Sequence, residues 1–148
     1  YYKAPEKTRE STRDGFFTVG DVGHLDEDGY LFLSGRSAEL IISGGVNIYP
    51  AEIEGCLAAH PAVADVGVIG VPNEEWGEEV KAVVELREGV EPSAELAEQL
   101  IAHCRDSLAR YKVPRTVDFR AALPRTDTGK LHKRLLREEY SAAAGQHR

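Results

Sequence analysis

Two apolar, β-branched runs in the middle of the chain constrain its fold more than any other feature. Residues 63–71 and residues 80–86 each predict a strand with little polar surface, and Pro72-Asn73 after the first run favours a turn. Further along, Ser93 suits the N-cap of a helix over residues 94–110, where apolar side chains recur along one helical face. A chain of 148 residues is long enough to bury such a core without disulfides.

Shorter elements flank this core on both sides. Before it, two short strands (39–42 and 48–49) enclose the glycine-rich turn Ser43-Gly44-Gly45-Val46-Asn47, and Pro50 suits the start of a helix that His60-Pro61 ends. After it come a strand over residues 116–119, a loop over 123–129 and a helix over 131–140. The order β-β-α-β-β-α-β-α over residues 39–140 predicts an α+β fold, a two-layer sandwich of short mixed strands and three helices.

The first part of the chain has a different character. Residues 1–13 are polar and predict a loop or a short helix, and Phe16–Val19 predicts a strand that Gly20-Asp21 breaks. A hairpin follows over residues 25–33, with Asp28-Gly29 as its turn. The small residues 34–38 after it predict a domain boundary.

Charge is distributed unevenly along the chain. The net charge is -7, from 18 Lys and Arg against 25 Asp and Glu, yet residues 105–137 carry a net charge of +7 and the remainder -14. An acidic body disfavours binding to nucleic acid or to an anionic membrane. The basic third of the chain predicts either contact with an anion or a solvated helix face and loop.

Residue types that bind metals in proteins are sparse. Cys56 and Cys104 lie far apart, and the five histidines lack metal-ligand spacing, so we expect no metal held by the protein. Sparse cysteine favours a reducing cytoplasm.

No apolar run reaches the roughly 18 residues that a membrane helix needs, and no signal peptide is recognisable. Methionine is absent, even at position 1, which suggests a piece of a longer protein.

Several common motifs are missing, and four unusual segments remain. Thr128-Gly129-Lys130 is not part of a P-loop, because Pro124 stands where the first glycine belongs and Leu131 where Ser or Thr belongs. The remaining segments are, in order, Phe17-Thr18-Val19-Gly20-Asp21 with Leu25–Tyr30 and Gly35-Arg36; Glu39–Glu54; Tyr111-Lys112-Val113-Pro114; and Leu123–Lys130.

In this order and spacing the four segments resemble the C-terminal portion of the acyl-adenylate-forming enzymes. That family contains acyl-CoA synthetases, luciferases and nonribosomal peptide adenylation domains. The resemblance spans residues 1 to about 140, and the segment Gly44–Glu54 is most similar to the acyl-CoA synthetase branch. It implies that a carboxylate attacks the α-phosphorus of Mg²⁺-bound ATP to give acyl-AMP, and that the thiol of coenzyme A then displaces AMP.

The resemblance also implies a domain organisation. Residues 1–36 would be the end of a large N-terminal adenylating domain, residues 37–38 the hinge, residues 39–140 a mobile C-terminal domain, and residues 141–148 a frayed tail. The phosphate loop and the acyl pocket would belong to that missing N-terminal domain, so the isolated chain is expected to be inactive. The hinge residue would be Ala38, where relatives usually carry Asp or Lys.

Two residues of the first segment are expected at the nucleotide. Asp21 matches the aspartate that accepts hydrogen bonds from ribose hydroxyls, and its alternative is a plain turn aspartate. Arg36 matches an arginine that reaches the nucleotide, and its alternative is an interdomain salt bridge. The chain departs from the family at Val19, where threonine is usual.

A second group is expected at coenzyme A. The turn Ser43-Gly44-Gly45 matches the loop that lines the pantetheine tunnel, unless it is a plain hairpin turn. Tyr111 would pack on the coenzyme A nucleotide, with Lys112 and Arg115 near its phosphates. Trp76 would either touch coenzyme A or anchor its own loop.

Lys130 is the expected catalytic residue. In the family this lysine bridges the carboxylate and the α-phosphate during adenylation, and a cation there stabilises charge on the transferring group. The alternative is an ordinary surface lysine.

Two other functions of the protein remain open: loading of a carrier protein instead of coenzyme A, and a free-standing nucleotide or nucleic-acid binding module. The acidic body and the lack of interleaved aromatic residues disfavour the second of these.

Overall fold

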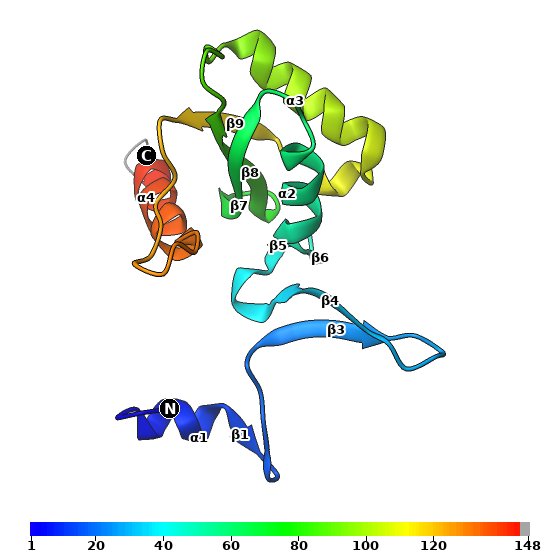
Figure 1. The fold of residues 1–148 in the computed structure, drawn as a ribbon, viewed down its shortest axis with the longest axis vertical. Coiled ribbons are helices and arrows are strands. Elements are labelled where there is room, and N and C mark those ends of the chain that lie inside the picture. Colours follow the sequence, from blue (N-terminus) through cyan, green and yellow to red (C-terminus); the bar gives the residue numbers. More distant parts are fainter. Residues whose placement is uncertain (146–148) are drawn as a thin grey trace. The chain divides into compact units, whose positions relative to one another are not determined.

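The chain divides between Ala38 and Glu39. In the computed structural model, which describes residues 1–145, Tyr1–Ala38 form one compact unit and the residues from Glu39 onward form another. Figure 1 shows the two units as the blue and the cyan-to-red parts of the ribbon. The division falls beside residues 37–38, which the sequence predicts as a hinge.

The first unit contains a short helix and two hairpins. Helix α1 (Pro5–Glu10) precedes strands β1 (Thr12–Arg13) and β2 (Phe16–Phe17), and strands β3 (Asp21–Leu25) and β4 (Leu31–Arg36) form the second hairpin. Two predictions were wrong here, since β2 ends at Phe17 rather than Val19, and Asp21 begins a strand instead of breaking one.

The hairpin β3–β4 is longer than predicted, and its turn is stabilised by hydrogen bonds of its own. The Asp26 carboxylate accepts hydrogen bonds from the backbone N–H groups of Asp28 and Tyr30, at 3.0 and 2.8 Å. Gly29 supplies the left-handed backbone of the turn, with φ +85°. Asp21 and Arg36 are thereby cross-strand partners at the open end of the hairpin.

The second unit is built on one mixed sheet. Its strands are β5 (Ile41–Ser43), β6 (Val46–Ile48), β7 (Val63–Asn73), β8 (Gly77–Leu86) and β9 (Thr116–Arg120). They lie in the order β6-β5-β8-β7, and β9 pairs in parallel with β8. Strand β7 continues through Pro72-Asn73, where the sequence predicts a turn, because an edge strand tolerates proline.

The helices are α2 (Pro50–Ala58), α3 (Ala94–Ser107) and α4 (Lys133–Gly145), with 3₁₀ turns η1 (Ser37–Glu39) and η2 (Arg110–Lys112). The predicted cap is confirmed, because Ser93 Oγ accepts from Leu96 N at 3.1 Å. Helix α3 ends earlier than predicted since Leu108 is extended. Helix α4 continues past residue 140 because alanines follow, and the rest of the predicted frayed tail, 146–148, lies outside the described residues.

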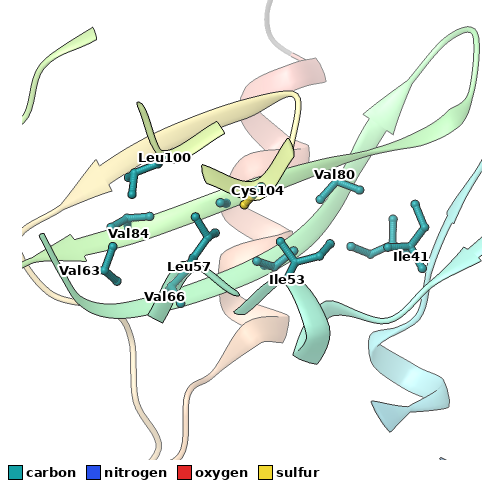
Figure 2. Packing of buried hydrophobic residues seen from close by; sticks show 12 residues of the cluster. Ile41, Ile53, Leu57, Val63, Val66, Val80, Val84, Leu100 and Cys104 are labelled. Carbon is teal, nitrogen blue, oxygen red and sulfur yellow. The ribbon is translucent and has the colours of Figure 1, made fainter. Parts of the chain in front are cut away.

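The sheet is covered on both faces. Helices α2 and α3 pack on one face, where the strands contribute Ile41, Val66, Val80 and Val84 and the helices contribute Ile53, Leu57, Leu100 and Cys104 (Figure 2). Helix α4 covers the other face through Leu136, which packs with Ile69 and Val83. The α+β class with three helices is confirmed, and α4 adds a layer to the predicted sandwich (Figure 1).

Candidate functional site

Asp21 and Arg36 lie side by side in the first unit. Arg36 Nε is 3.3 Å from Asp21 Oδ1, and both side chains remain accessible, at 59% and 34%. The ion pair therefore lies within one unit, unlike the interdomain salt bridge considered for Arg36. A planar guanidinium beside a carboxylate offers donors and an acceptor together, a combination suited to the hydroxyls and phosphate of a nucleotide.

The turn Gly44-Gly45 connects β5 and β6. Both glycines have left-handed backbones, with φ +56° and +79°, as a two-residue type I′ turn between Ser43 and Val46 requires. The two positions differ in their surroundings. A Cβ on Gly44 would come within 2.7 Å of Trp76 Cε3, whereas a Cβ on Gly45 would meet no atom within 4 Å. Gly44 is therefore packed, and Gly45 faces open space.

Trp76 braces this turn from the β7–β8 connection. The backbone carbonyl oxygen of Trp76 accepts from Gly44 N at 2.8 Å, and the backbone N–H of Trp76 donates to Asn73 Oδ1 at 3.0 Å. The guanidinium of Arg115 lies 5.6 Å from the centroid of the Trp76 ring, which remains 39% exposed. Trp76 thus anchors its loop and also presents a surface. Five of the residues predicted at coenzyme A are brought together: Ser43, Gly44, Gly45, Trp76 and Arg115.

Lys112 and Tyr111 are held differently. Lys112 Nζ lies 2.6 Å from Glu52 Oε2 of α2, and this hydrogen bond raises the pKa of Lys112 above its usual value. Lys112 is therefore engaged with a carboxylate rather than presented as an unpaired cation. Tyr111 lies beside it on η2 and is 53% exposed. Within residues 1–145, no hydrogen bond, ion pair or ring contact joins this pair to Trp76 or Arg115.

Lys130 lies on a tight turn that closes on its own backbone. Thr126 N donates to Lys130 O at 2.8 Å, Lys130 N donates to Thr126 Oγ1 at 3.2 Å, and Gly129 N donates to Thr126 O at 2.8 Å. Arg125 donates to Gly129 O at 2.6 Å and pairs with Asp65 of β7. The turn is thereby fixed to the sheet while the Lys130 side chain is exposed.

Most cations of the basic third are neutralised by the rest of the domain. Six of the ten basic residues of 105–137 form ion pairs with carboxylates: Lys112, Arg120, Arg125, Lys133, Arg134 and Arg137. Within residues 1–145, Lys130 has no such partner and no side-chain hydrogen bond. Much of the positive charge of this segment is therefore internal. Lys130 shares the lack of a carboxylate partner with Arg105, Arg110 and Arg115, and among these four it is the one that lies on the closed turn at Thr126–Lys130.

The two candidate turns are attached to different parts of the sheet. The Lys130 turn is held at Asp65 and Leu131, which lies against Gly67 in β7. The Gly44-Gly45 turn lies instead beside Trp76, just past the last residue of β7. From Gly67 to Asn73 is about 20 Å of strand.

The buried Cys104 is not positioned for thiolate chemistry. Burial, followed by the nearby Cys56, raises the pKa of Cys104 to about 12, so its thiolate is not populated near neutral pH. No cluster of three or more His, Cys, Asp or Glu suited to a metal occurs within residues 1–145. Over the same residues, no helix is long and apolar enough to cross a membrane.

Several interacting residues escape local sequence patterns. Glu78 and Ile42 are 36 residues apart and hydrogen-bonded, and Lys133 bridges Glu39 and Glu54. Only strand pairing and helix packing bring these residues together, and no motif marks them. The one sequence feature that could have indicated these pairs is that Glu39, Glu54 and Glu78 interrupt or adjoin apolar segments.

The sheet, its helices and the order of the four segments define the C-terminal portion of an adenylate-forming enzyme. The model of the AMP-binding enzyme C-terminal domain matches residues 52–130. The chain belongs to this family.

Several curated relatives carry CoA ligase names. It is 46% identical over 143 residues to the long-chain-fatty-acid–CoA ligase FadD13 of Mycobacterium tuberculosis, covering 96% of this chain and 27% of the relative. It is 48% identical over 137 residues to the 2-succinylbenzoate–CoA ligase of Geobacillus kaustophilus, covering 93% and 27%. The structure of the ATP-bound RpMatB-BxBclM chimera B1 matches with a TM-score of 0.87 and 46% identity, covering 95% of this chain and 28% of that one. The chain thus spans about a quarter of the length of these relatives.

Proposed function

We propose that this chain is the C-terminal portion of an AMP-forming acyl-CoA ligase. A carboxylate oxygen of the substrate attacks the α-phosphorus of Mg²⁺-bound ATP, pyrophosphate leaves, and acyl-AMP forms. The sulfur of coenzyme A then attacks the acyl carbon, the bond to AMP breaks, and the thiol proton is released. The N-terminal part of the enzyme supplies the phosphate loop and the acyl pocket, so this chain alone does not catalyse the reaction.

The available Lys130 is the observation that carries this proposal. Its turn is rigid because the backbone hydrogen bonds around Thr126 close it, and its ammonium group has no partner within residues 1–145. A preorganised cation of this kind stabilises the negative charge that develops on the carboxylate and the α-phosphate. Lys130 is the catalytic residue of the adenylation step.

Asp21 and Arg36 bind the nucleotide. Their ion pair joins Arg36 Nε to Asp21 Oδ1, and the two side chains stay 59% and 34% exposed. The carboxylate accepts from the ribose hydroxyls, and the guanidinium donates to ribose or phosphate oxygens. Because this pair belongs to the first unit, it stays with the nucleotide when the second unit moves.

The pivot of that motion is Ala38. On one side of it, Ser37 donates from both N and Oγ to Gly20 O within the first unit, at 2.8 and 3.1 Å. On the other side, Glu39 pairs with Lys133 within the second unit at 2.6 Å. Because Ser37 is held in the first unit and Glu39 in the second, the backbone rotation falls between these two residues. The motion exchanges the Lys130 turn for the Gly44-Gly45 turn at the active site.

The first unit also has a surface suited to the rest of the enzyme. Its large apolar side chains are 50–80% exposed at Phe16, Phe17, Tyr30, Leu31, Phe32 and Leu33. An apolar surface of this kind marks an interface. The N-terminal domain of the same polypeptide covers it.

The proposal is tested with the full-length enzyme and a panel of carboxylic acids. We expect pyrophosphate release with at least one acid, and AMP release together with thioester formation only when coenzyme A is added. The 148-residue chain alone is expected to release no pyrophosphate. Transfer to a carrier protein in place of coenzyme A would assign the enzyme to the carrier-loading branch, and the absence of pyrophosphate release with every acid would reject adenylation.

A further inference from the structure

The β5–β6 hairpin shares few backbone pairs with the rest of the sheet, although its Ile41 and Ile48 are fully buried in the core. In the described ladder, Ser43 with Gly77 is the residue pair that joins β5 to β8, whereas β7 and β8 pair along their whole length. The tip of the hairpin is braced by the hydrogen bond from Gly44 N to Trp76 O at 2.8 Å. The core therefore holds the base of the hairpin at Ile41 and Ile48, and the turn end depends on the contacts near Ser43 and Gly44.

Glu78 supplies a third attachment through its side chain. Its Oε2 accepts a hydrogen bond from the backbone N–H of Ile42 at 2.8 Å, where a ladder bond would otherwise be expected. Ile42 lies two residues before Gly44, and Glu78 lies two residues after Trp76. One carboxylate therefore links the base of the turn to the strand that carries its brace.

The Glu78 carboxylate is itself oriented by helix α4. Its second oxygen, Oε1, pairs with Arg137 Nη2, and the side chains of both residues are partly buried, at 24% and 35% exposure. Gly70 leaves the necessary room, since a Cβ there would lie 2.9 Å from the carboxylate. Lys133, four residues earlier on the same helical face, pairs with Glu39 and Glu54. Helix α4 thus pairs with Glu39, two residues before β5, and with the carboxylate that accepts from Ile42.

We propose that Glu78 is a positioning residue for the Gly44-Gly45 turn and, through it, for the thioester-forming step. The inference rests on the proposed function, which assigns that turn to the path of the coenzyme A thiol. Displacement of a positioned group by about 1 Å is enough to cost on the order of 100-fold in rate. A carboxylate that accepts from Ile42 and is held by Arg137 prevents such a displacement.

The test compares Glu78→Ala and Glu78→Gln in the full-length enzyme, with the carboxylic acid that gives pyrophosphate release. Glu78→Ala removes the acceptor for Ile42, and we expect the KM for coenzyme A to rise about tenfold or more while adenylation changes less than about threefold. Glu78→Gln keeps an amide oxygen that accepts from Ile42, and it should retain most of the coenzyme A step. Glu98→Ala, which removes an exposed glutamate of α3, serves as the control.

Hydrogen exchange provides a second measurement that a general loss of stability would not reproduce. In Glu78→Ala, peptides covering residues 41–48 should exchange faster, while peptides of β7 and the middle of β8 should not change. If Glu78→Ala fails to fold, Arg137→Ala replaces it, with Arg134→Ala as the matched control on the exposed side of the same helix.

Unchanged exchange over residues 41–48, or equal slowing of both half-reactions, would overturn the proposal. Faster exchange with unchanged coenzyme A kinetics would also overturn it, because the contact would then have no role in positioning. If the unmodified enzyme does not use coenzyme A at all, the proposed function has failed, and the exchange measurement alone still decides whether Glu78 holds the turn.

Discussion

The turn at Lys130 and the turn at Gly44-Gly45 both rely on glycines with left-handed backbones, but different interactions hold them. The Lys130 turn closes within the five residues from Thr126 to Lys130, and the pairing of Arg125 with Asp65 fixes it to β7. The Gly44-Gly45 turn depends on residues distant in sequence, because Trp76 packs against Gly44 and Glu78 holds Ile42.

This difference indicates what each turn is built to present. A turn that is stabilised by its own backbone leaves its side chain available, and Lys130 presents a charge. A turn that is held by its neighbours presents a shape, namely the open backbone at Gly45 beside the Trp76 ring. Substitutions should therefore affect charge at the first turn and packing or access at the second.

The largest expected effect is on the first turn. Lys130→Ala should slow adenylation by about 10²–10³, because a preorganised charge is lost. Thioester formation from supplied acyl-AMP should stay within about threefold of the unmodified enzyme. Since Lys130 has no partner within residues 1–145, the free energy of unfolding should change by less than about 0.5 kcal/mol. Pyrophosphate release and AMP release time the two steps, with Arg134→Ala as the control.

If Lys130→Ala slowed adenylation and thioester formation equally, the proposal that the two turns serve different steps would be wrong. Lys130 would then be a general electrostatic or structural residue.

Gly45→Leu should show the opposite pattern. Its side chain would project into open space beside the turn and obstruct the path proposed for pantetheine. Thioester formation should fall on the order of 10–100-fold while adenylation remains within about threefold. Gly45→Ala has the same backbone strain at positive φ but a smaller side chain, so it distinguishes obstruction by the side chain from the effect of backbone strain. An equal slowing of adenylation by Gly45→Leu would contradict the assignment of this turn to the second step.

Ala38→Pro tests whether the two turns alternate at one active site. Proline fixes φ and should hinder rotation between the anchors at Ser37 and Glu39. We expect thioester formation to slow about tenfold more than adenylation, measured by the same two assays. Ala38→Gly, which leaves the backbone free, should behave like the unmodified enzyme. Retention of both rates in Ala38→Pro would place the pivot elsewhere.

The smallest expected effect is on stability within the second turn. Gly44→Ala and Gly45→Ala both place a Cβ at positive φ, at a cost of about 1–2 kcal/mol each. Gly44→Ala should lower the free energy of unfolding by about 1 kcal/mol more, because its Cβ meets the Trp76 ring at 2.7 Å. Denaturation followed by circular dichroism measures the difference. In the Trp76→Ala background the two alanine variants should become equal, and a persistent difference would show that Trp76 is not its cause.

The sequence predicts well where the structure is local. The Ser93 cap, the long apolar strands and the turn at Gly44-Gly45 depend on residues within a few positions of one another, and all three occur. The predicted ends of strands and helices were less accurate, since strand β3 begins at Asp21 and helix α3 ends at Ser107. Those ends are set by cross-strand pairing to Arg36 and by the extended backbone at Leu108, which local propensity does not specify.

For the candidate site, too, local features could be predicted from the sequence and long-range contacts could not. The sequence by itself determined the order of elements, the α+β class, the left-handed turns and the residue types at Asp21, Arg36, Gly44, Gly45 and Lys130. Only the tertiary structure decided which cations are neutralised, because pairs such as Lys112 with Glu52 and Arg125 with Asp65 each join residues 60 apart. It also placed α4 on the second face of the sheet and Glu78 beneath Ile42. The physical reason is that ion pairs and helix packing depend on distances in space, which the chain fixes only after β7, β8 and α4 have assembled.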